Sequence, residues 1–174
     1  MGTASARPVA NKYPSAHVLR IHGRLFLIDC GEGTQLQLSR YGFSHVKIDR
    51  IFISHLHGDH LFGFFGLVST MALMGRTAPL YVYAPIGFAG ILTFFMEHCG
   101  EGVVFEIIHV PLTSLVPRVI YEGKSVEVSA FGLNHRVDAF GFLFREKEPA
   151  RNIHKWKIKA DNLTLAEIGT LKRG

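Results

Sequence analysis

The chain has 174 residues, a hydrophobic fraction of 48% and a formal net charge of +5 at pH 7. This length suits one compact domain, and the apolar content excludes a disordered chain. No uncharged apolar stretch reaches the roughly 20 residues that a membrane-spanning helix needs, and no signal peptide is visible. We therefore expect no membrane span.

The opening of the chain predicts a hairpin followed by a short helix. Residues 17–21 and 25–29 are strand-like runs, with a turn at Gly23 between them. Thr34 follows a glycine-rich turn and is expected to cap a helix over residues 35–41.

A cluster of metal-binding side chains follows the next predicted strand, residues 50–54. Residues two apart in an extended segment point the same way, so His55 and His57 can share one metal ion. Asp59 and His60 can then face a second ion. Imidazole and carboxylate ligands suit Zn²⁺, with Mn²⁺ or Fe²⁺ as alternatives. The pattern indicates a two-metal hydrolase, and the competing interpretation is a solvated loop that happens to be rich in histidine.

The middle and late parts of the chain predict two helices and then mainly strands. The first predicted helix covers residues 61–74 and ends at Gly75, and the second covers residues 86–99. The expected strands are residues 80–84, 103–111, 114–121, 124–133 and 140–144. Helices alternate with strands early and strands cluster later, which predicts an α/β sandwich of sheets flanked by helices.

The two cysteines and the uneven charge carry weaker signals. Cys30 and Cys99 have no metal-type spacing, so we expect buried free thiols in a reducing cytoplasm. Residues 145–174 hold eight basic and four acidic residues, and this net +4 is most of the excess charge. The segment fits either a polyanionic partner or an ordinary solvated basic helix.

Four stretches together carry a family resemblance. They are Gly2-Thr3-Ala4-Ser5-Ala6, the run Asp29-Cys30-Gly31-Glu32-Gly33-Thr34-Gln35, residues 47–60 and residues 66–77. The His-Leu-His-Gly-Asp-His motif resembles the metallo-β-lactamase superfamily, and the longer set resembles the ribonuclease Z family, endonucleases that trim 3′ trailers from precursor tRNA. The resemblance runs from Gly2 to about Phe144. It implies a metallo-β-lactamase-type αββα sandwich, of which this chain covers mainly the N-terminal half.

The resemblance implies a role for each residue of the cluster. His55, His57 and a partner, His135 after the strand 124–133, would ligate one zinc ion. Asp59 and His60 would ligate a second. Asp59 is also the candidate base near the attacking water. Asp29 would brace the metal loop without binding metal, as outer-shell residues do.

The family pattern also requires residues that cannot be placed here. They are a bridging aspartate, a further histidine on the second zinc and a Glu/His pair that protonates the leaving group. We therefore expect residues 1–144 to form the N-terminal part of the domain, with the C-terminal half absent from this chain. These 174 residues alone are expected to bind at most one zinc tightly and to be inactive on precursor tRNA.

Residues 145–174 correspond in position to the flexible arm that clamps tRNA in this family. The candidate RNA contacts are Lys155, Lys157, Lys159, Lys172 and Arg173, with Trp156 as a possible packing or stacking residue. Family members act as homodimers, and the predicted helix 61–74 fits either a dimer contact or plain core packing.

Two other functions stay open. The chain could be another hydrolase of the same fold acting on cyclic nucleotides, sulfate esters or small phosphodiesters. It could also be a non-catalytic RNA-binding or dimer-partner subunit.

The remaining histidines are expected at the surface or half-buried: His17, His22, His45, His98, His109 and His154.

Overall fold

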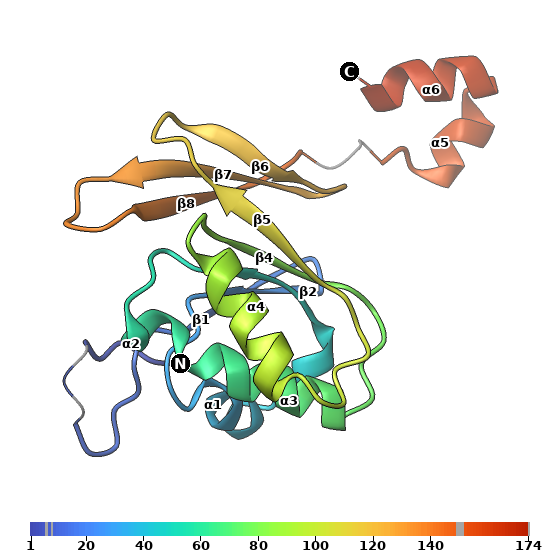
Figure 1. The fold of residues 1–174 in the computed structure, drawn as a ribbon. Helices are drawn as coiled ribbons and strands as arrows, with labels where there is room; N and C mark the ends of the chain where they lie inside the picture. The colour runs from blue at the N-terminus through green and yellow to red at the C-terminus, as the bar shows by residue number, and fades with distance from the viewer. Residues whose placement is uncertain (6, 8, 149–151, 174) are drawn as a thin grey trace.

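The computed structural model describes residues 1–5, 7, 9–148 and 152–173, and the described residues build two β-sheets (Figure 1). The first sheet has five strands in the order β1-β2-β3-β4-β5, which are His17–Ile21, Arg24–Ile28, Ile48–Phe52, Leu80–Pro85 and Ile107–Leu112. The second has three strands, β6 (Arg118–Glu122), β7 (Val126–Leu133) and β8 (Ala139–Glu146).

The two sheets differ in strand direction. In the first sheet β1 and β2 pair antiparallel through a tight turn at His22 and Gly23, both with positive φ. Strands β2, β3, β4 and β5 then run parallel, so their carboxyl ends share one edge. The second sheet is antiparallel throughout. Functional side chains commonly collect at the carboxyl edge of a parallel sheet.

A helical layer covers one face of the five-stranded sheet. It consists of α1 (Thr34–Arg40), α3 (Gly63–Leu73) and α4 (Phe88–Cys99). Their apolar side chains form one core with the strands, as Phe64 and Phe88 do with Ile51. The short helices η1 (His45–Lys47) and α2 (Gly58–Leu61) lie in the connections.

The three-stranded sheet covers the opposite face. Phe26 and Phe52 from the first sheet pack edge-on against Phe144 and Phe142 of β8, at centroid distances of 5.6 and 5.3 Å. Val128 lies in the same buried cluster. The predicted sandwich of sheets flanked by helices is therefore confirmed, with a separate core on each face of the central sheet.

The predicted helix over residues 61–74 is wrong as a single element. The structure has α2 and α3, which meet at Phe62. Gly63 approaches the Gly31 carbonyl so closely that an added Cβ would lie 1.9 Å from that oxygen. The Gly63 amide also donates to the Cys30 carbonyl at 2.9 Å. This contact fixes the start of α3 against the segment after β2 and interrupts the helix.

The predicted cap at Thr34 is also wrong. Thr34 is the first residue of α1, and Gly33 is the cap residue, with φ of 76°. The Thr34 hydroxyl donates to the Gly31 carbonyl at 2.6 Å, so it closes the preceding turn and caps no helical amide.

The bounds of two strands differ from the predicted ones. β3 ends at Phe52, two residues before the predicted end, so Ser54 belongs to the following loop. β5 begins at Ile107, because Phe105 packs into the helix-side core and Val103 closes a turn on Gly100.

The basic segment forms two helices, α5 (Lys155–Ala160) and α6 (Leu165–Arg173), which Figure 1 draws apart from the sandwich. The Glu167 amide donates to Thr164 Oγ1 and the Thr164 amide donates to the Glu167 carboxylate, so α6 begins with a capping box. Across the described part of the chain, each helix is too short or too polar to cross a membrane.

The two cysteines differ in exposure, so the prediction that both are buried is wrong for Cys99. Cys30 is buried, and this burial raises the pKa of its thiol to about 12. Cys99 is exposed at the end of α4. We expect a thiol-specific reagent at pH 8 to label one cysteine in the native protein and both in denaturant, because the thiolate is the reactive form. Two thiols of equal native reactivity, counted by mass spectrometry, would contradict this packing.

Candidate metal centre

The histidine-rich loop leaves the carboxyl edge of the central sheet. It follows β3, and His57 is the residue that precedes the first turn of α2. His55 is 9% exposed, while Asp59 and His60 within α2 are part-buried. The sheet therefore holds the start of this loop, and α2 directs its end.

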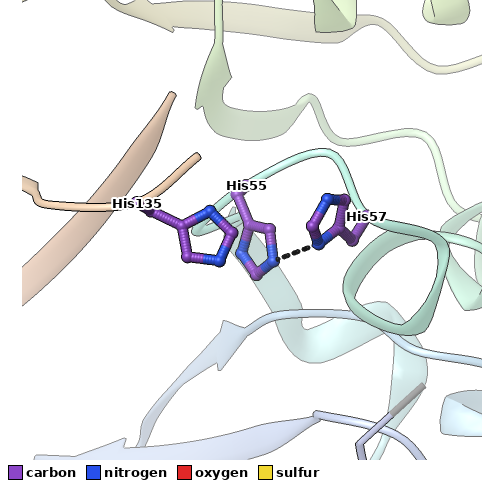
Figure 2. A group of neighbouring side chains, drawn as sticks. All are labelled: His55, His57 and His135. Carbon is purple, nitrogen blue, oxygen red and sulfur yellow. Dashed lines mark hydrogen bonds between the residues drawn. The ribbon is translucent and has the colours of Figure 1, made fainter. Parts of the chain in front are cut away.

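Three histidines converge in front of this edge (Figure 2). His55 Nε2 lies 3.1 Å from His57 Nδ1, and the His135 ring lies 5.0 Å from that of His55 and 5.5 Å from that of His57. One nitrogen from each ring falls within 4.8 Å of the other two. The structure thus brings together residues that are about 80 positions apart in the sequence.

His135 arrives from the second sheet. It follows β7, in the connection to β8, and its side chain is exposed. The amide of Phe140 in β8 donates to the Ser54 carbonyl at 2.9 Å, which ties this hairpin to the metal loop. The sheet-to-sheet contact thereby sets where His135 lies relative to His55.

The donor set fits a divalent metal ion. Zinc–nitrogen bonds of about 2.0–2.1 Å in a tetrahedral site separate the nitrogens by roughly 3.3 Å, which is close to the His55–His57 spacing. Burial, followed by the charges of His60 and His57, lowers the pKa of His55 to about 4. His55 is therefore neutral at pH 7, the form in which imidazole binds metal.

Asp59 and His60 lie beside the three-histidine cluster, outside it. The His60 ring is 4.0 Å from that of His55, and His60 Nε2 is 3.5 Å from the Asp59 carboxylate. His60 Nδ1 faces away, toward Asp29, at 2.7 Å. Asp59 and His60 Nε2 thus form a second, smaller group of donors next to the first.

Asp29 supports the second group of donors through hydrogen bonds to its carboxylate. It is 5% exposed and takes a positive φ of 56° directly after β2. Its carboxylate accepts hydrogen bonds from Ser15 Oγ and the Ser54 amide, both at 2.9 Å, and from His60 Nδ1. Burial raises the pKa of Asp29, but the bonds from His60 and Ser54 outweigh it and the net pKa is lowered. These hydrogen bonds connect Asp29 to the start of the metal loop at Ser54 and to the ring of His60.

Sequence reasoning missed two serines that complete this network. Ser15 bonds Asp29, and Ser54 Oγ lies 3.0 Å from His55 Nδ1 and 3.3 Å from His60 Nδ1. Ser54 directly precedes the first histidine of the motif, and that position was the available signal. Ser15 carries no local signal, since it reaches Asp29 through the fold.

A cavity of about 670 Å³ opens beside the cluster, within the usual size range of ligand sites. His57 and Asp59 form one wall, and Tyr13 and Phe62 form apolar parts of the lining. Arg7 and Lys12 of the N-terminal loop also line it. The combination of cations and aromatic rings beside metal-type ligands suits a phosphorylated ligand with a planar group.

The remaining predicted residues lie elsewhere. His45 is buried, where its Nε2 lies 2.9 Å from the Gln35 carbonyl, so the prediction of a surface or half-buried side chain is wrong for it. His109 is half-buried, and exposed positions are found for His17, His22, His98 and His154. The basic-segment lysines are exposed as well, namely Lys155, Lys157, Lys159 and Lys172. The side chain of Arg173 lies outside the described residues.

Trp156 on α5 is 64% exposed, and the ammonium of Lys157 lies 5.7 Å from its ring centroid. This aromatic ring beside lysines is available to solvent, at a distance in sequence from the histidine cluster.

Comparison with known proteins gives one family and a consistent set of relatives. The family model described as Anti-Pycsar protein Apyc1 matches residues 1–87. A ribonuclease Z from Bacteroides thetaiotaomicron is 38% identical over 178 residues, covering 100% of this chain and 55% of the relative. One from Cytophaga hutchinsonii is 42% identical over 174 residues, again covering 100% and 55%. The chain spans about half the length of the curated relatives it matches.

Solved structures agree on the fold. The crystal structure of human tRNase Z, short form, is similar with a TM-score of 0.76 and 35% identity, covering 84% of this chain and 62% of that one. The metallo-β-lactamase fold protein YhfI from Bacillus subtilis has a TM-score of 0.63 at 18% identity, covering 83% and 56%. The second match bears on the fold alone.

Proposed function

Because this chain belongs to the family described as Anti-Pycsar protein Apyc1, is homologous to ribonuclease Z and has the metallo-β-lactamase fold, we propose that it forms part of a zinc-dependent endoribonuclease. The proposed reaction removes 3′ trailers from precursor tRNA by hydrolysis of one phosphodiester bond. The observation that supports this most strongly is the convergence of His55, His57 and His135 from both sheets within a chain that resembles ribonuclease Z along its whole length.

We assign the metal ligands as follows. His55, His57 and His135 would hold one Zn²⁺ ion, and Asp59 with His60 Nε2 would hold part of the coordination of a second, with Mn²⁺ or Fe²⁺ as possible substitutes. Bound metal would supply an activated water and would stabilise charge on the attacking and leaving oxygens.

The chain's own residues would prepare the site for this chemistry. Asp59 is the candidate base, since it lines the cavity together with His57. Asp29 holds His60 so that Nε2 faces the site. Arg7 and Lys12 would neutralise phosphates of the RNA strand, and Tyr13 and Phe62 offer apolar surface for a base.

A cleavage assay tests the proposal. The protein translated from the reading frame that contains this chain should cut a precursor tRNA after the discriminator base, leaving a tRNA 3′-hydroxyl and a trailer 5′-phosphate. A chelator should abolish the cleavage and added Zn²⁺ should restore it. Hydrolysis of cyclic nucleotides, sulfate esters or small phosphodiesters without any cleavage of precursor tRNA would favour another hydrolase of this fold.

We propose further that residues 1–144 and 145–174 are distinct functional parts, the first a metal-binding part of the domain and the second the start of an RNA-binding arm. The 174-residue chain alone should then bind one Zn²⁺ tightly and should not process precursor tRNA. The reason is that the described residues bring together one three-nitrogen cluster, with only Asp59 and His60 beside it. Calorimetry that finds two tightly bound Zn²⁺ ions per chain would contradict this proposal. Cleavage of precursor tRNA by the 174-residue chain alone would also contradict it.

The arm gives a salt-dependent prediction. Changing Lys155, Lys157 and Lys159 to glutamine should weaken binding of precursor tRNA and make the slope of log affinity against log salt shallower by about 2–3, since each lost phosphate contact removes roughly 0.7–0.9 from the slope. Three exposed cations on the sandwich, Arg20, Lys47 and Lys124, provide the matched control. Fluorescence anisotropy measures the binding. If the triple lysine variant and the unmodified protein have the same salt slope, the proposal that α5 belongs to an RNA-binding arm is rejected.

We also propose that the protein is a homodimer. We propose that it is located in the cytoplasm, which agrees with the proposed tRNA substrate. Most of the apolar residues of α3 face the core, and Leu73 and Met74 at its end are exposed. Sedimentation velocity should give twice the monomer mass, and a monomer at micromolar concentration would reject the dimer.

A further inference from the structure

We propose that Ser54 is a positioning residue that bonds Asp29 through its amide and His55 through its hydroxyl, so that one buried carboxylate orients ligands in both proposed metal positions. The inference rests on the metal centre proposed above. It assigns a role to a side chain that is not itself a metal ligand.

The first link is direct. Asp29 Oδ2 lies 2.7 Å from His60 Nδ1, which places the proton on Nδ1 and leaves the Nε2 lone pair facing Asp59. Ser15 Oγ donates to the same carboxylate oxygen at 2.9 Å and so fixes its position. This link orients the histidine of the second metal position.

The second link passes through Ser54. Its amide donates to Asp29 Oδ1 at 2.9 Å, and its carbonyl accepts from the Phe140 amide at 2.9 Å. With the backbone held on both sides, the hydroxyl has few positions open to it, and the one observed lies 3.0 Å from His55 Nδ1. This link orients the central histidine of the first metal position.

The direction of the hydrogen bonds follows from the chemistry of the groups. A hydroxyl has one proton to donate and two lone pairs. Nε2 of His55 faces the cluster, and a neutral imidazole that binds a metal ion through Nε2 carries its proton on Nδ1. A lone pair of Ser54 Oγ then accepts from His55 Nδ1–H, and the second ring nitrogen, Nε2, is deprotonated.

The consequence is the correct tautomer of His55 before any metal arrives. Nε2 is the nitrogen of His55 that faces His57 Nδ1 at 3.1 Å inside the cluster. A hydrogen bond to the opposite ring nitrogen fixes both the tautomer and the orientation of a ligand histidine, and the loss of such a partner typically costs 10–100-fold in metal affinity.

The test compares three variants by competition titration of Zn²⁺ against a chromophoric chelator. Ser54→Ala removes only the hydroxyl and keeps both backbone bonds, and its affinity should fall about 10–100-fold. Ser54→Thr keeps a hydroxyl and should recover most of the affinity. Ser69→Ala is the matched control, since the Ser69 hydroxyl bonds the Phe65 carbonyl on the surface of α3. Thermal unfolding of the metal-free proteins should be similar for all three, which separates positioning from folding.

A second measurement needs no variant and no metal. Nitrogen-15 NMR of the metal-free protein at pH 7.5 should find His55 as the Nδ1–H tautomer, and Ser54→Ala should shift it toward Nε2–H. An Nε2–H tautomer in the unmodified protein, or an unchanged zinc affinity in Ser54→Ala, would overturn the proposal. If the unmodified protein binds no metal at all, the proposed function fails, whereas the NMR result still decides the link between Asp29, Ser54 and His55.

Discussion

Changing His55 to alanine is expected to remove tight zinc binding from the chain. The His55 ring is central to the site, with its centroid 4.7 Å from that of His57, 4.0 Å from His60 and 5.0 Å from His135. Its loss deletes a ligand, so the affinity should fall by more than the roughly 10–100-fold that outer-shell changes cost. Isothermal titration with Zn²⁺ measures the effect.

The matched control for this change is His98→Ala. His98 is exposed near the end of α4, where its Nδ1 lies 3.0 Å from the Phe94 carbonyl, and its removal should leave zinc binding unchanged. Circular dichroism of both metal-free variants should match the unmodified protein. Tight zinc binding retained by a folded His55→Ala variant would show that the three histidines do not form the zinc site.

Changing Arg76 to leucine is expected to lower the free energy of unfolding by about 3 kcal/mol or more. Arg76 is 3% exposed, and its guanidinium donates to four backbone carbonyls at 2.7–3.0 Å. These belong to Val46, Ile48, Ala78 and Pro79. Hydrogen bonds to charged groups contribute about 1.5–3 kcal/mol each and are not additive, and orphaned buried carbonyls add a desolvation cost.

The reason for so large an effect is that Arg76 joins segments that the sheet alone does not. It connects the chain entering β3 with the chain entering β4, beside the end of α3. Urea denaturation measures the loss, with the exposed Arg40→Leu on α1 as the control. A change of less than about 0.5 kcal/mol, the usual range for surface substitutions, would show that the four carbonyls find other donors.

The local part of the site was predictable from the sequence, because its geometry is local. His55, His57, Asp59 and His60 lie within six residues, so the spacing alone predicts neighbouring ligands. His135 was placed only through the family resemblance. Its position depends on the hydrogen bond between Phe140 and Ser54, a contact between two sheets that no periodicity records.

Other features could not be predicted because they depend on side chains meeting across the fold. Ser15 and Asp29 are 14 residues apart and bond only after β1 and β2 have formed their hairpin. The interruption between α2 and α3 depends on the approach of Gly63 to Gly31. The sequence predicted the class of fold but not the strand order, and several strand ends differ from the prediction by one to four residues, as at β5, where Phe105 packs into the helix-side core.

The most direct test of the metal centre is an anomalous difference map at the zinc edge from crystals grown with Zn²⁺. We expect a peak within about 2.0–2.1 Å of one nitrogen each from His55, His57 and His135. A zinc peak elsewhere on the protein with none among these three histidines would contradict it.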